Sequence, residues 1–238
     1  YREGLRSYAV VLLVEGSDAT ANERVRADAE AAIAAREGRE PAEVALDHLL
    51  SNGGRGMLYL PFNDPRAALK TVEKYAANKS VVGFMVSSTR YKPVYHDDYM
   101  PLYAAIQESG KPLGFHAGFH WGDQSMQQCN RFISMHSISF VYFNLLHLTN
   151  WLVNGLPERF PKLKVIYVEG SEFWFNWMNT MMDIRASVKH TSGKLGDFRA
   201  KLTMKPSEYF ARNMWVVASA LADRDTAIAC KELGMNRV

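Results

Sequence analysis

The chain has 238 residues, enough for one large domain or two small ones, and its 47% hydrophobic and 22% charged content is that of a globular protein. The net charge of +3 is small and the basic residues form no cluster, which argues against a nucleic-acid partner. No apolar run approaches the ~20 residues of a membrane span, and the widely separated Cys129 and Cys230 fit a reducing compartment, so we expect a cytoplasmic protein without a membrane partner.

The first 55 residues are predicted to form a helical region that precedes a more regular part of the chain. Their apolar run Tyr8–Val14 is either a buried strand or an apolar anchor segment. A capping-box pattern introduces a helix over Ala21–Glu37, rich in good helix formers, and a second helix is predicted over Pro41–Leu50. We therefore predict a single domain, with an N-terminal helical or insert region over 1–55 and its units of alternating strands and helices over 56–238.

Short apolar runs alternate with helical segments through the second region. The predicted strands are Met57–Leu60, Val81–Val86, Leu113–Phe115, Lys164–Val168 and Met214–Ala218. The predicted helices are 65–78 (capped by Asp64), Tyr99–Ser109, Ser125–Asn154, Glu172–Val188 and Asp223–Leu233. Because the strands are continuous apolar runs, we expect them to be buried on both faces of a parallel sheet. No strand is followed by a Gly-rich phosphate loop, which favours a barrel of repeated βα units over a nucleotide-binding doubly wound fold.

Functional residues of such a barrel lie at the carboxyl ends of its strands. His116 directly follows one predicted strand, Glu169 directly follows the next, and Arg90 lies shortly after an earlier one. An imidazole and a carboxylate at one mouth suit a divalent metal ion, and they equally suit metal-free acid–base catalysis. Structural roles also stay open, because His116 could bond a backbone carbonyl, Glu169 could cap the following helix and Arg90 could be a solvated loop charge.

The residues around these strand ends are rich in aromatic side chains, including Trp121 and Trp174. They either pack the barrel mouth or form a wall for a planar substrate. His120 lies four residues after His116, but the segment is predicted to be a loop, in which that spacing does not place both rings on one side. We therefore assign His120 to the loop above the site and not to a metal pair with His116.

Several motifs resemble the amidohydrolase-related family, or amidohydrolase family 2, which is typified by aminocarboxymuconate-semialdehyde decarboxylase. The run GLPERFPKLKVIYVEG at 155–170 is similar to the family's helix end and strand, with Trp174 and Asp183 at the expected distances beyond it. Tyr99–Ala117 resembles the preceding helix and strand end, and Lys205–Tyr209 resembles a Lys-Pro-Ser-x-Tyr motif. Together the matching segments extend over most of the chain.

The resemblance implies an α/β fold, a (β/α)8 TIM barrel of amidohydrolase type, with a divalent metal, zinc or manganese, at its C-terminal mouth. His116 matches the family's metal ligand after the fifth strand. The family's first-strand His-x-His or Glu-x-His has no match, and its last strand would begin beyond Val238, so we expect an incomplete barrel that lacks its first and last strands. The family's decarboxylases carry a histidine where this chain has Glu169, so their activity does not transfer whole.

The implied function is a metal-dependent enzyme that hydrolyses or non-oxidatively decarboxylates a small carboxylated, aromatic substrate. The expected catalytic residues are His116, also the metal ligand, and Glu169. The expected substrate contacts are Arg90, His120, Trp121 and Trp174. The resemblance also implies a homodimer. The alternative is an inactive or metal-free barrel fragment with a structural role only.

Overall fold

A computed structural model describes residues 35, 36, 38, 55–87, 92–116, 123–169, 173–187 and 202–217. The predictions that fall outside these residues concern Tyr8–Val14, most of Ala21–Glu37, Pro41–Leu50 and Asp223–Leu233. The division of the chain at residue 55 therefore stays a prediction.

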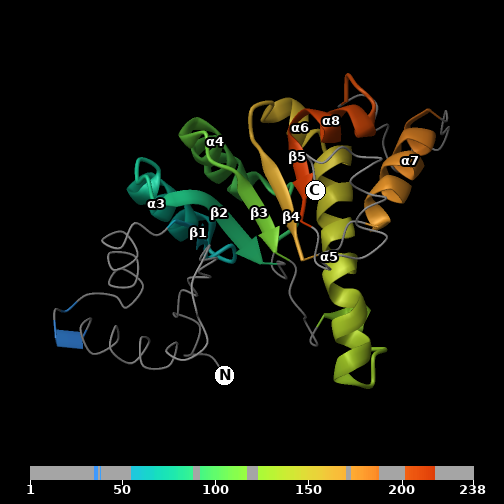
Figure 1. Ribbon diagram of the computed structural model, residues 1–238, viewed down its shortest axis with the longest axis horizontal. Coiled ribbons are helices and arrows are strands. Elements are labelled where there is room, and N and C mark those ends of the chain that lie inside the picture. The colour runs from blue at the N-terminus through green and yellow to red at the C-terminus, as the bar shows by residue number, and fades with distance from the viewer. Residues whose placement is uncertain are drawn as a thin grey trace.

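The described residues contain one parallel sheet whose strands follow one another in chain order, β1-β2-β3-β4-β5 (Figure 1). These strands are β1 (Gly56–Tyr59), β2 (Val81–Ser87), β3 (Leu113–His116), β4 (Val165–Val168) and β5 (Met214–Val216). The predicted strands and their parallel arrangement are confirmed, with small differences at the ends. Sequential order is that of a barrel wall, whereas a doubly wound sheet reverses its strand order at a switch point.

Helices connect the strands, and four of the predicted helices are confirmed in the described part of the chain. They are α3 (Pro65–Tyr75), α4 (Met100–Ser109), α5 (Phe132–Val153) and α7 (Phe173–Ser187). Two short helices, α6 (Leu156–Arg159) before β4 and α8 (Pro206–Asn213) before β5, were not predicted, and both contain a proline in the first turn. None of the described helices is long and apolar enough to cross a membrane.

The predicted helix Ser125–Asn154 is wrong at its start. The structure has a separate 3₁₀ turn at Gln124–Met126, and α5 begins only at Phe132. Asp123 causes the turn, because its Oδ1 accepts a hydrogen bond from the backbone N–H of Ser125 at 2.9 Å. Arg131 then adopts an extended backbone, φ −138° and ψ 145°, which separates the turn from the helix.

Asp64 begins α3 in the way the sequence predicts. Its Oδ1 accepts hydrogen bonds from the backbone N–H groups of Arg66 and Ala67, both at 3.1 Å, and Pro65 occupies the first helical position. Because two N–H groups would lose their acceptor, Asp64→Ala should lower the free energy of unfolding by about 1 kcal/mol. Asp64→Asn keeps the acceptor and should recover most of the loss in urea denaturation. Equal stability of Asp64→Ala and wild type would contradict this capping role.

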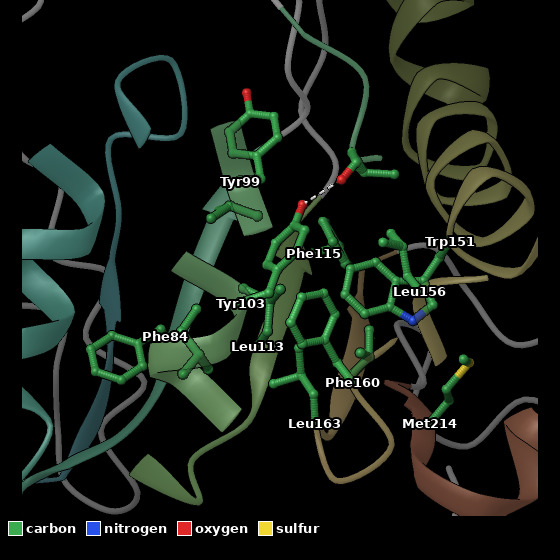
Figure 2. Close-up of a cluster of buried hydrophobic side chains, with 14 of the residues drawn as sticks. Phe84, Tyr99, Tyr103, Leu113, Phe115, Trp151, Leu156, Phe160, Leu163 and Met214 are labelled. Atoms are coloured by element: carbon green, nitrogen blue, oxygen red, sulfur yellow. Dashed lines mark hydrogen bonds between the residues drawn. The ribbon is translucent and has the colours of Figure 1, made fainter. Parts of the chain in front are cut away.

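The core lies between the sheet and helices α4 and α5 (Figure 2). Trp151 of α5 stands edge-on to Tyr103 of α4, with ring centroids 5.0 Å apart, and edge-on to Phe115 of β3 at 5.8 Å. The buried Tyr103 hydroxyl donates to the carbonyl of Val94 at 2.9 Å, so its polar end is satisfied. These rings fix how the two helices sit against β3.

Strand register separates the two faces of the sheet. Phe115 pairs with Val86 and with Tyr167, and all three belong to the core beneath the helices. Because successive side chains of a strand point to opposite faces, the next residue, His116, points to the other face. His116 pairs there with Ser87 on one side and Val168 on the other. The face opposite this core is therefore where the strand-end residues gather.

Glu158 connects α6 to the segment that precedes α8. Its Oε1 accepts hydrogen bonds from the backbone N–H of Thr203 at 2.9 Å and from the hydroxyls of Thr203 and Tyr209. These hydrogen bonds lower the pKa of Glu158 from its ordinary value of 4.5. The Thr203 hydroxyl has the largest effect, and the Tyr209 hydroxyl and the Thr203 N–H have smaller ones. These bonds stabilise the charged carboxylate in the folded protein.

This lowered pKa predicts an acid-sensitive contribution to stability. Since the folded pKa lies below the unfolded one, the contribution is fully present above pH 4.5 and is lost as the pH falls through the folded value. Glu158→Gln should therefore reduce the loss of stability in acid, as measured by denaturant unfolding across pH. Glu73→Gln, on the exposed side of α3, changes the charge equally and is the control. A Glu158→Gln profile parallel to that of wild type would refute the prediction.

Candidate active site

His116 is the last residue of β3 and lies at the carboxyl end of the sheet, as the sequence predicts. Its side chain is 23% exposed, so it is partly buried but accessible. Its ring is 6.4 Å from that of Phe140 on α5, at an interplanar angle of 71°. In Figure 1 the start of α5 extends beyond the arrowheads of β2 and β3, on the side where these strands end.

Glu169 directly follows β4, the strand that pairs with β3. Its φ of 56° lies in the left-handed region, which among the described residues no other non-glycine residue occupies. This backbone conformation costs an L-residue about 1–2 kcal/mol, and such strain is concentrated at functional sites. In this conformation Glu169 Oε2 lies 3.0 Å from His116 Nε2. Two residues 53 positions apart thus meet at one end of the sheet.

Two further polar residues lie on the same face. Ser87 ends β2 and pairs with His116, and Tyr59 ends β1 and pairs with Met85, two residues before Ser87. Burial raises the pKa of Tyr59 above its ordinary value, and the hydrogen bond with the Ser87 side chain acts in the opposite direction. The phenol therefore stays neutral near pH 7 and can donate a proton or a hydrogen bond. Sequence reasoning missed Tyr59, although the strand's period of two places it on this face.

The other predicted site residues do not join this group in the described structure. Trp174 is 3% exposed and its ring stands edge-on to that of Tyr167, at 6.5 Å, in the core. Its assignment as a substrate contact stays a prediction, but its position is that of a packing residue. Arg90, His120 and Trp121 lie outside the described residues. The structure therefore brings together His116 and Glu169 and adds Tyr59 and Ser87.

The His116–Glu169 pair has the chemistry and the spacing of two metal ligands. Imidazole nitrogen and carboxylate oxygen both bind zinc and manganese. Two such atoms at ~2.0–2.1 Å from one tetrahedral ion lie about 3.3 Å apart, close to the 3.0 Å between Nε2 and Oε2. Within the described ranges, no group of three or more His, Cys, Asp or Glu side chains surrounds one point. The described donors thus fit part of a metal coordination shell.

A sequential parallel sheet with an imidazole and a carboxylate at neighbouring strand ends has the architecture of a βα-barrel enzyme. The chain belongs to the amidohydrolase family: the family model described as Amidohydrolase matches residues 1–225. The predicted family and fold class are confirmed. No curated protein matches the chain.

Solved structures agree with this fold. A dihydroxybenzoic acid decarboxylase from Polaromonas sp. JS666, with bound manganese and the inhibitor 2-nitroresorcinol, aligns with 90% of this chain at a TM-score of 0.64 and 18% identity. The 5-carboxyvanillate decarboxylase LigW from Sphingomonas paucimobilis aligns with 93% at 0.62 and 22% identity. An amidohydrolase from Mycobacterium avium subsp. paratuberculosis K-10 aligns with 76% at 0.60 and 16% identity. The chain spans 61%, 62% and 46% of their respective lengths.

Proposed function

We propose that the chain carries part of the active site of a metal-dependent enzyme that acts on a small carboxylated, aromatic substrate, by non-oxidative decarboxylation or by hydrolysis. The observation that carries the proposal is the 3.0 Å approach of His116 Nε2 and Glu169 Oε2 at the ends of adjacent strands. The solved decarboxylases of benzoate derivatives that share the fold support decarboxylation as the first reaction to test.

His116 would hold the metal through Nε2, and Glu169 would contact it or the substrate through its carboxylate. The manganese in the Polaromonas structure supports a divalent ion, and zinc stays a prediction from the ligand types. When bound, the ion would supply Lewis acidity that orients the substrate's oxygen atoms and stabilises developing negative charge. The chain's own residues would then handle substrate position and protons.

Glu169 would transfer protons, a role supported by the 53% exposure of its side chain and by the oxygen that faces His116. In decarboxylation it would deliver a proton, taken up from water, to the ring carbon that bears the carboxylate. The bond to the carboxylate then breaks, its electron pair returns to the ring and carbon dioxide leaves. In hydrolysis the same carboxylate would take a proton from the attacking water and pass it to the leaving group.

Substrate recognition would combine flat apolar contacts with polar ones. Phe140 next to His116 offers a ring surface for a planar substrate, and Tyr59 offers a neutral hydroxyl. We propose Arg90 as the partner of a second anionic group, with His120 and Trp121 in the loop above the site. These assignments rest on the sequence.

The proposal is tested with the chain supplied with Mn²⁺ or Zn²⁺ in separate assays. Calorimetry measures metal binding, and incubation with 2,6-dihydroxybenzoate, with 5-carboxyvanillate and with a simple aryl lactone distinguishes release of carbon dioxide from ring opening. Activity that a chelator removes and the metal restores would support the proposal. Absence of divalent-metal binding would overturn it in favour of the metal-free structural alternative.

We also propose that the protein works as a homodimer in the cytoplasm. The exposed apolar residues Ile138, Tyr142 and Leu146 form a stripe along one side of α5, which supports a contact between copies. The free thiol of Cys129 supports a reducing compartment. Sedimentation equilibrium should give twice the mass of the chain, and a monomer at micromolar concentration would contradict the dimer.

A further inference from the structure

The buried face of α5 carries polar residues among its apolar ones. Leu148, Trp151 and Leu152, towards the end of the helix, are buried hydrophobic residues. Asn144 and Ser139, nearer its start, are 0% exposed. Burying an amide or a hydroxyl is unfavourable unless it makes hydrogen bonds. The buried polar side chains of this face therefore require an explanation that packing alone does not supply.

Among the described residues, Asn144 makes one hydrogen bond, which connects α5 to the end of β4 beside the candidate site. Its Nδ2 donates to the backbone carbonyl of Val168 at 3.0 Å. Val168 is the last residue of β4, and its carbonyl belongs to the same peptide plane as the backbone N–H of Glu169. Among the described residues, Asn144 Oδ1 has no hydrogen-bond partner. The hydrogen bond that Asn144 donates thus ends on the carbonyl immediately before Glu169.

This contact bears directly on the unusual backbone of Glu169. The φ angle of Glu169, 56°, is a rotation measured against the peptide plane that Asn144 holds. A residue stays in the left-handed region only when its surroundings restrict the alternatives. If that plane turns, the carboxylate of Glu169 leaves the direction that brings Oε2 to 3.0 Å from His116 Nε2.

We infer that Asn144 is a positioning residue that fixes the Val168–Glu169 peptide and thereby holds the Glu169 carboxylate against His116. The expected effect on metal binding rests on the proposed function. The expected effect on the position of the Glu169 carboxylate does not. In this role Asn144 acts through Glu169, by way of the Val168 carbonyl.

The test is a double-mutant cycle on the full 238-residue chain. Asn144→Leu removes the amide donor at similar size, and Asn144→Ala removes it without adding bulk, in case leucine prevents folding. Each is made alone and together with Glu169→Ala. Ser139→Ala, a second buried polar residue of the same helix face, is the matched control. Two quantities are measured: Mn²⁺ affinity by calorimetry, and the imidazole ¹⁵N resonances of His116 at one fixed pH, assigned with His116→Gln.

Asn144→Leu should weaken Mn²⁺ binding by about 10- to 100-fold, the effect of losing a residue that orients a ligand. It should also shift the His116 resonances, and both effects should largely disappear in the Glu169→Ala background. Ser139→Ala should leave both quantities unchanged. Equal effects in the two backgrounds would overturn the inference and make Asn144 a purely structural residue. If the wild-type chain binds no Mn²⁺, the proposed function fails, and the His116 resonances alone decide: a folded Asn144 variant with unshifted resonances overturns the inference.

Discussion

Replacing His116 by alanine is expected to weaken Mn²⁺ binding by at least about 100-fold, because changing residues that merely orient a metal ligand already costs about 10- to 100-fold. The fold should persist, since the His116 side chain is 23% exposed and lies on the face opposite the aromatic core. Isothermal calorimetry gives the affinity, and circular dichroism on the same sample confirms the fold.

His136→Ala is the matched control for this experiment. His136 is an exposed histidine on α5, and its ring lies 5.1 Å from that of Phe140, which also neighbours His116. Its replacement should leave Mn²⁺ affinity within about twofold, a change worth only a few tenths of a kcal/mol. Unchanged affinity of His116→Ala, or an equal loss in both variants, would remove His116 from the proposed metal site.

Trp151→Ala should have the largest effect on stability, lowering the free energy of unfolding by about 3–5 kcal/mol. Trp151 is 1% exposed and joins α5 to both α4 and β3 through Tyr103 and Phe115. Its removal leaves a cavity at the point where three elements meet, and the rings around it cannot all close the gap. Denaturant unfolding monitored by far-ultraviolet circular dichroism measures the loss without relying on tryptophan fluorescence.

Trp177→Ala is the control, because it makes the same chemical change at an exposed position outside the core. Trp177 lies on α7 and is 60% exposed, so its loss should change stability by no more than about 0.5 kcal/mol. Comparable losses for Trp151→Ala and Trp177→Ala would mean that the aromatic cluster beneath the sheet is not the main support of α5.

The strands were predictable because burial on both faces leaves a strong signal in the sequence. Val81–Val86 and Val165–Val168 read as uninterrupted apolar runs. A strand that is covered on one face only would instead alternate between apolar and polar residues. The short helices α6 and α8 were missed because they are too brief to show a helical period. The start of α5 was misplaced because a side-chain hydrogen bond of Asp123 overrides the helical propensity of the residues after it.

Of the candidate site, only the residues at the very ends of β3 and β4 could be predicted from the sequence. His116 and Glu169 follow directly from the rule that functional residues lie at the carboxyl ends of barrel strands. Tyr59 was missed, since a tyrosine in an apolar strand is more often a core residue. Asn144 could not be found at all, because its role depends on how α5 lies over the end of β4, which no local pattern encodes. Trp174 was predicted to contact the substrate because of its aromatic ring, but in the structure that ring packs against Tyr167 in the core.

Strand order also sets the sequence of events in folding. β1, β2 and β3 are separated by short connections, whereas the pairings of β3 with β4 and of β4 with β5 each close a much longer stretch of chain. Loop-closure entropy and contact order both favour the early pairings. We therefore expect β1–β3 to assemble first and β4 to dock later, guided by α5. His116 ends β3 and Glu169 follows β4, on opposite sides of that late junction, so their 3.0 Å approach forms only in this later step.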